Sequence, residues 1–133
     1  MPYCTREDVE NVYGVDNLLD WADVNGTGDA AAIANRISWS LDRATRRINA
    51  RLQRRNFEIP FALPYPGIII DTAADLAGYY LYFARMLDAE DRSKNNLSHM
   101  LKSAEQTLDE IVKGEIILSN TMQDHTDAPF VQK

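Results

Sequence analysis

The sequence has little cysteine, no long apolar run and a shortage of positive charge. Its 133 residues contain one cysteine, Cys4, so no internal disulfide can form and a zinc site cannot be built from thiols. The longest apolar run, Leu76 to Ala84, is about half as long as a membrane span requires. The first residues lack the basic and apolar stretches of a signal peptide. We therefore expect one soluble domain made in a reducing compartment, with no membrane partner.

The charge is negative overall and unevenly distributed. Fourteen Lys and Arg against twenty Asp and Glu give a net charge of −6, which disfavours a generally basic nucleic-acid coat protein. Residues 36–55 carry seven arginines against Asp42 alone, whereas the first 29 residues carry seven acids against Arg6 alone. A chain polarised in this way is suited to contacts with copies of itself, basic face on acidic face.

The hydrophobic pattern predicts an all-α fold, a small bundle of three long helices. A short N-terminal helical segment precedes the bundle: Thr5 and Asp8 resemble a capping box, the first helix should end at Gly14, and residues 15–23 should add a turn or two. The long helices are expected at residues 30–54, 68–88 and 93–113, with a proline-rich connector at 56–67 between the first two.

The first long helix carries the most informative pattern. Its apolar stripe comprises six residues at helical spacing: Ile33, Ile37, Leu41, Ala44, Ile48 and Leu52. Trp39 lies nearly opposite this stripe, with Arg43 and Arg46 one turn further on. We expect Trp39 to be exposed in the free subunit and to form a subunit interface, because Trp and Arg dominate interface hot spots. A solvated face with a partly covered Trp is the alternative, and acids such as Asp75 are candidates to neutralise much of the arginine stripe. The predicted interface comprises Trp39, Arg43, Arg46 and Arg47 on one subunit and Glu7, Glu10, Asp16 and Asp20 on its neighbour.

No pattern in the sequence indicates catalysis, a metal or a cofactor. The turn at residues 23–29 resembles the first half of a calcium loop, but the position that needs a bidentate acid is Ala34. His99 and His125 have no partners at metal-ligand spacing. The sequence also lacks a Gly-rich phosphate loop and a G-x-S-x-G motif. We predict a protein that is not an enzyme and has no catalytic residue, metal or cofactor.

The end of the chain is predicted to bind a partner. Residues 115–118 form a short apolar, strand-like piece, and an isolated strand edge invites pairing with another chain. We expect Ile116, Ile117 and Leu118 to contact that partner. Residues 1–118 should form the helical domain, and residues 119–133 a flexible tail that becomes ordered on assembly.

Four segments occur in an order and spacing that suggest a known family. They are the opening Tyr3-x-Thr5-Arg6-x-Asp8-Val9 closing at Gly14, the connector Ile59-Pro60-Phe61-x-Leu63-Pro64, the run Ala74-Asp75-Leu76-Ala77-x-Tyr79-x-Leu81-Tyr82, and the ending Ile111-x-Lys113-Gly114-Glu115-Ile116. Together they resemble the Mu-like phage head–tail connector family, which consists of head-completion or adaptor proteins.

This resemblance implies a structural virion protein that is made in the host cytoplasm and located at the head–tail junction. Its copies would form a ring, usually of twelve, below the portal protein. The ring would extend the DNA channel, let DNA pass without specific binding, and offer a platform to the next connector or tail component. Residues 1–118 would then be the adaptor domain.

A DNA-binding packaging or regulatory protein is the alternative function. It would use the Arg-rich helix at residues 36–55 to bind phosphates, and its affinity for DNA would fall by orders of magnitude as salt rises to the physiological range. An adaptor would show little affinity for DNA at physiological salt.

Overall fold

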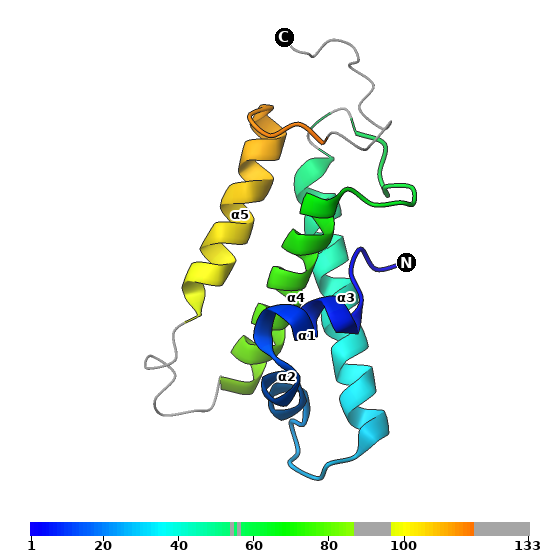
Figure 1. Cartoon of the computed structure of the whole chain (residues 1–133), viewed down its shortest axis with the longest axis vertical. Helices are drawn as coiled ribbons and strands as arrows, with labels where there is room; N and C mark the ends of the chain where they lie inside the picture. Colours follow the sequence, from blue (N-terminus) through cyan, green and yellow to red (C-terminus); the bar gives the residue numbers. More distant parts are fainter. Residues whose placement is uncertain (54, 56, 87–96, 119–133) are drawn as a thin grey trace.

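The computed structural model of this chain describes residues 1–53, 55, 57–86 and 97–118. In this part of the chain the regular structure consists of helices, without a strand, so the all-α prediction is confirmed. Three long helices form a bundle, and two short ones lie across one side of it (Figure 1). The helices are α1 (Arg6–Tyr13), α2 (Val15–Ala22), α3 (Ala30–Leu52), α4 (Gly67–Met86) and α5 (Ser98–Lys113).

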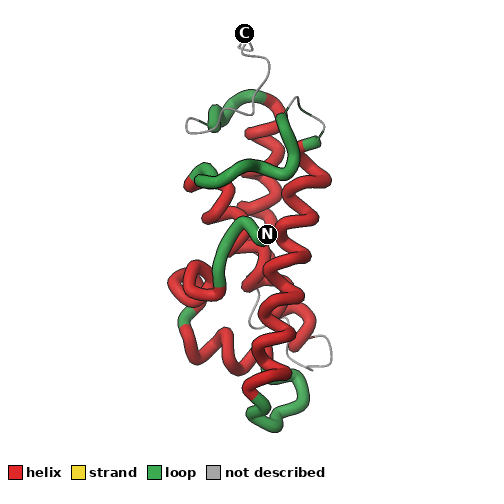
Figure 2. The backbone as a smooth tube through the Cα atoms, turned by 90° about the vertical axis from the view of Figure 1, so that its right-hand side faces the viewer, coloured by secondary structure: helices red, strands yellow, loops and turns green. Residues whose placement is uncertain are grey.

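Helix α4 is the centre of the bundle, and the other four helices all pack against it. Its sequence is apolar around most of its circumference, so it can bury several faces at once. Eleven of its residues are buried: Ile69, the three from Thr72 to Ala74, and the seven from Leu76 to Tyr82. In the described part of the chain α1 and α2 touch α3 and α4 but do not touch α5. Seen from the side, the short helices project from one face of the bundle (Figure 2).

Local signals in the sequence set the helix ends. The predicted capping box is present, since the Asp8 amide donates to Thr5 Oγ1 at 3.2 Å and the Thr5 amide donates to Asp8 Oδ2 at 2.8 Å. Gly14, at a φ of 94°, lets the chain turn sharply from α1 into α2. Asp29 caps α3 by accepting a hydrogen bond from the Ala31 amide. The predicted start of α5 at residue 93 and end of α4 at residue 88 lie outside the described residues, as does residue 54.

A buried tyrosine near the N-terminus fixes the connector to the bundle. Tyr3 is 1% exposed; its hydroxyl donates to Asn49 Oδ1 at 2.5 Å and accepts from the Phe61 amide at 2.9 Å. Its ring packs against Phe61 and Tyr65 of the connector. The start of the chain, α3 and the connector therefore meet at one side chain, which sets where α1 begins.

The prediction of a strand-like segment at residues 115–118 is wrong. The backbone there is irregular, because the amides of Glu115 and Ile116 donate back to the Glu110 carbonyl and close the end of α5. These donors are therefore not available to a partner strand. Leu118 is buried against the core, whereas Ile117 is 74% exposed. The predicted tail, residues 119–133, lies outside the described residues.

Candidate functional site

The Arg-rich helix α3 is placed by its apolar stripe. All six predicted stripe positions are buried against the rest of the bundle, together with Ser40, whose hydroxyl donates to the Ile37 carbonyl of the preceding turn. The helix is thereby held in one rotation about its axis, and its arginines come to lie beside the stripe. The buried residues are Ile33, Ile37, Ser40, Leu41, Ala44, Ile48 and Leu52.

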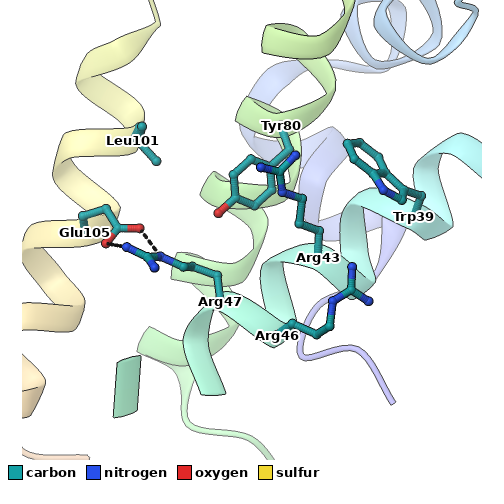
Figure 3. Close-up of a pocket in the computed structure, with 7 residues that line it drawn as sticks. All are labelled: Trp39, Arg43, Arg46, Arg47, Tyr80, Leu101 and Glu105. Carbon is teal, nitrogen blue, oxygen red and sulfur yellow. Dashed lines mark hydrogen bonds and ion pairs between the residues drawn. The ribbon is translucent and has the colours of Figure 1, made fainter. Parts of the chain in front are cut away.

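These arginines line an open groove of about 760 Å³ between α3, α4 and α5. Trp39 and Arg43 project from α3 toward Tyr80 of α4, and Leu101 points in from α5 (Figure 3). The groove therefore combines aromatic and aliphatic walls with a strongly positive edge. Its full lining is Trp39, Arg43, Arg46, Arg47, Tyr80, Leu101 and Glu105.

Trp39 is partly buried, which corrects the expectation that it would be exposed in the free subunit. The Arg36 guanidinium lies 4.2 Å from the ring centre and that of Arg43 lies 5.5 Å from it. Arg43 also lies 4.3 Å above the Tyr80 ring, so one guanidinium is shared between two aromatic rings. A helical-wheel projection of α3 could not show this burial, because the Trp39 ring is covered by long arginine side chains and by the neighbouring helix.

Arg47 is paired within its own chain. Its Nε and Nη2 donate to the two carboxylate oxygens of Glu105 at 2.8 and 2.9 Å, and Arg51 donates to the same carboxylate. Arg51 also lies 3.6 Å from Asp109. The Arg47 hydrogen bond lowers the pKa of Glu105, so this carboxylate is ionised at neutral pH. Arg47, predicted at a subunit interface, therefore joins α3 to α5.

Arg43 and Arg46 differ from Arg47 in this respect. Both side chains are exposed, and within the described ranges no carboxylate forms an ion pair with either one. Arg46 points away from the other groove residues (Figure 3). Two positive charges at the edge of the groove are therefore available to an external acidic group.

The predicted role of Asp75 in neutralising this stripe is wrong. Asp75 lies on the side of α4 that faces the N-terminal segment, where its backbone carbonyl accepts a hydrogen bond from the Tyr13 hydroxyl at 2.6 Å. Burial, and secondarily Asp71, raises the pKa of the Asp75 carboxyl to about 6. The acids that neutralise part of the arginine stripe are instead Glu105 and Asp109 of α5.

The predicted acidic partners lie on α1 and α2, away from the groove. On α1, Glu7 is exposed and Glu10 forms an ion pair with Arg6 at 3.1 Å. On α2, Asp16 and Asp20 are both exposed and one helical turn apart. Because α1 and α2 do not touch α5 in the part of the chain that is described, the acids and the groove belong to different sides of one subunit.

Within the described residues, no other cluster of side chains indicates a metal-binding or catalytic site. No three His, Cys, Asp or Glu side chains gather there as a metal site would require. In the turn at residues 23–29, Asp23 Oδ2 accepts from the Gly28 amide at 3.0 Å, so this carboxylate closes the turn. Burial raises the pKa of the Cys4 thiol to about 12, which keeps the thiol protonated.

Sequence reasoning missed Tyr80, Leu101 and Glu105 as groove residues, because each comes from a helix other than α3. A signal for one of them was present: Glu105 and Asp109 are one turn apart on the last long helix of the predicted bundle. None of the helices in the described ranges has the length and apolar character needed to cross a membrane.

Comparison with known proteins gives one family. The family model described as Bacteriophage Mu, Gp36 matches residues 3–131, nearly the whole chain. Searches among curated proteins and among solved structures gave no match. The matched range contains every helix and all the groove residues, and it includes the four segments whose order suggested a Mu-like phage protein. The chain therefore belongs to the bacteriophage Mu Gp36 family.

Proposed function

We propose that this phage protein is a structural adaptor whose copies form a closed ring at the head–tail junction of the virion, below the portal protein. The observation that carries the proposal is the separation of two complementary surfaces on one subunit. The groove presents Arg43 and Arg46 beside Trp39, and the short helices α1 and α2 present acids on another side. A ring built from one repeated heterologous contact needs two different surfaces of this kind on every subunit.

The subunit contact in this proposal joins the groove of one copy to the acidic helices of the next. Trp39, Tyr80 and Leu101 supply apolar area, and the two unpaired arginines supply charge. Such a combination is typical of interface hot spots, in which a partly buried aromatic group is flanked by Arg. Arg47 contributes indirectly, because its pair with Glu105 holds α5 against α3 and so keeps the groove in shape.

The partners along the channel axis are the portal protein on one side and the next connector or tail component on the other. Ile117 and the half-buried Ile116 are the surface residues proposed for one of these contacts, together with the tail at residues 119–133. Leu118 is excluded from it, because its side chain is already in the core.

DNA passes through the proposed ring without specific binding, in keeping with the net charge of −6. The alternative, a DNA-binding protein that uses the Arg-rich helix, is weakened by the structure. Arg47 and Arg51 are paired with acids of α5, and the Arg36 guanidinium lies against the Trp39 ring. Few arginines of α3 are then left to bind phosphates. The proposed mechanism is assembly, and it needs no catalytic residue and no cofactor.

Native mass spectrometry of the purified protein, alone and mixed with the portal protein of the same phage, tests this proposal. We expect a closed oligomer of defined copy number, either in the free protein or on the portal. A strict monomer in both samples would contradict the adaptor function.

A further inference from the structure

Helix α2 has two carboxylates that nothing in its own helix balances. Its sequence, Val15–Ala22, contains Asp16 and Asp20 and no basic residue. Like charges one turn apart weaken an isolated helix, and Asp20 lies in the last turn, where the helix dipole disfavours a negative charge. Both side chains are exposed. Arg85 of α4 donates to the Asp20 backbone carbonyl at 3.3 Å and offsets part of this charge, and cations of a partner that covers the helix would offset the rest.

The acids of α1 are used differently. Asp8 belongs to the capping box with Thr5, and Glu10 forms an ion pair with Arg6. Only Glu7 is left among the α1 acids as an exposed carboxylate for which the described residues provide no ion pair. Helix α2 is therefore the better candidate for a contact that needs two carboxylates at once.

The outer face of α2 also matches the groove in its apolar part. The helix buries Leu18, Trp21 and Ala22, which leaves Val15, 50% exposed, and Leu19, partly buried against the core, beside the two aspartates. One face of α2 thus combines acids with aliphatic side chains, and the groove combines arginines with Trp39 and Leu101.

The spacing of the charges agrees as well. Asp16 and Asp20 are four residues apart on α2, and Arg43 and Arg46 are three residues apart on α3. Both separations place side chains about 5–6 Å apart on one helix face. Two ion pairs can therefore form at once when the helices lie against each other and the exposed Arg46 side chain, which points away from the groove in the free subunit, turns toward α2.

We propose that α2 of one subunit docks in the Trp39–Arg43–Arg46 groove of the next, with Asp16 and Asp20 facing Arg43 and Arg46. This inference rests on the proposed ring and identifies the contact that closes it. A subunit does not fill its own groove, because the described part of the chain holds α2 against α3 and α4 and away from α5. The contact is therefore heterologous and repeats from copy to copy.

Two charge-reversed variants and their mixture test this contact. One variant carries Arg43→Glu and Arg46→Glu, and the other carries Asp16→Lys and Asp20→Lys. Each alone should need at least about 30-fold more protein than the wild type for half-assembly, because like charges then face each other. An equimolar mixture should assemble again, since each groove then finds a complementary α2. The readout is native mass spectrometry, alone and with the portal protein.

Asp71→Lys is the matched control, because it reverses an exposed acid on α4 that belongs neither to the groove nor to α1 and α2, and it should leave assembly within about twofold of the wild type. Thermal melts show whether each variant is folded, and the mixture separates a lost contact from lost folding. If the wild type assembles and both charge-reversed variants assemble equally well, or if the mixture fails to assemble, the α2 contact is wrong while the ring stands. If the wild type itself stays a monomer with and without the portal, the ring and the contact both fail.

Discussion

Replacing Gly78 by Ala should destabilise the subunit, although Ala is the better helix former. Gly78 lies inside α4, where Ala is favoured over Gly by about 1 kcal/mol in an open helix. The ring of Tyr13 packs directly on this glycine, and a Cβ at position 78 would come within 3.0 Å of three ring atoms. Tyr13 would have to move, and it is held by its hydrogen bond to the Asp75 carbonyl and by its edge contact with Trp21.

The expected size of the effect follows from these contacts. Overpacking of this kind costs about 1–3 kcal/mol, and losing the Tyr13 hydrogen bond costs about 1 kcal/mol more. After subtraction of the helix-propensity gain, the net loss should be about 2 kcal/mol. For a domain of this size that corresponds to a fall in Tm of roughly 7 °C.

Thermal melts followed by circular dichroism measure this loss, with Gly67→Ala as the matched control. Gly67 is the first residue of the same helix, and a Cβ there meets nothing within 4 Å. The control should change the free energy of unfolding by less than about 0.5 kcal/mol. In a Tyr13→Ala background, Gly78→Ala should become neutral or stabilising, because the ring is gone. A Gly78→Ala protein that melts at or above the wild-type temperature would refute the close packing of α1 on α4.

Three further predictions concern the groove and the buried carboxyl. Trp39→Ala should lower the free energy of unfolding of the free subunit by about 2 kcal/mol in a thermal melt, because the ring is partly buried and covered by two guanidinium groups. A loss near zero would show that the ring is exposed. In a denaturant titration, Glu105→Gln should lower the free energy of unfolding by about 1–2 kcal/mol, because it removes the charge shared by Arg47 and Arg51. Glu7→Gln should leave it almost unchanged in the same titration. The pKa of Asp75 is raised to about 6, so the stability that its protonated form contributes is full below about pH 4 and is lost as the pH rises through 6. Asp75→Asn should therefore melt above the wild type at pH 7 and approach it near pH 4, whereas a constant difference would show that the pKa of Asp75 is ordinary.

Most of the fold could be predicted from the sequence, because the helices are signalled locally. The six-residue stripe of α3 has the helical period and is buried at every position, and Thr5 with Asp8 forms the predicted cap. Helix α4 is apolar around most of its circumference, which is typical of a central helix, and α1, α2, α3 and α5 all pack on it. Residues 115–118 were predicted wrongly, because an apolar tetrapeptide has no period of its own and the end of α5 uses its amides.

The candidate site could be predicted only in part, because its electrostatics depend on which helices become neighbours. The sequence places Trp39 and the arginines on one side of α3, but the helix wheel cannot show that Arg36 and Arg43 fold back over the Trp39 ring. Nor can it show that Arg47 pairs with Glu105, 58 residues away. The prediction that Asp75 neutralises the arginines failed for the same reason. The helical period shows which residues share a face of α4 with Asp75, but only the packing of α1 against α4 shows that this face contacts Tyr13.

Electron cryo-microscopy of the mature particle of the phage that encodes this chain tests the central claim most directly. The adaptor function predicts a ring of copies below the portal, with each subunit presenting its groove to α2 of the next copy and with the DNA channel passing through the centre. A particle that lacks this protein, or that holds it away from the head–tail junction, would contradict the claim.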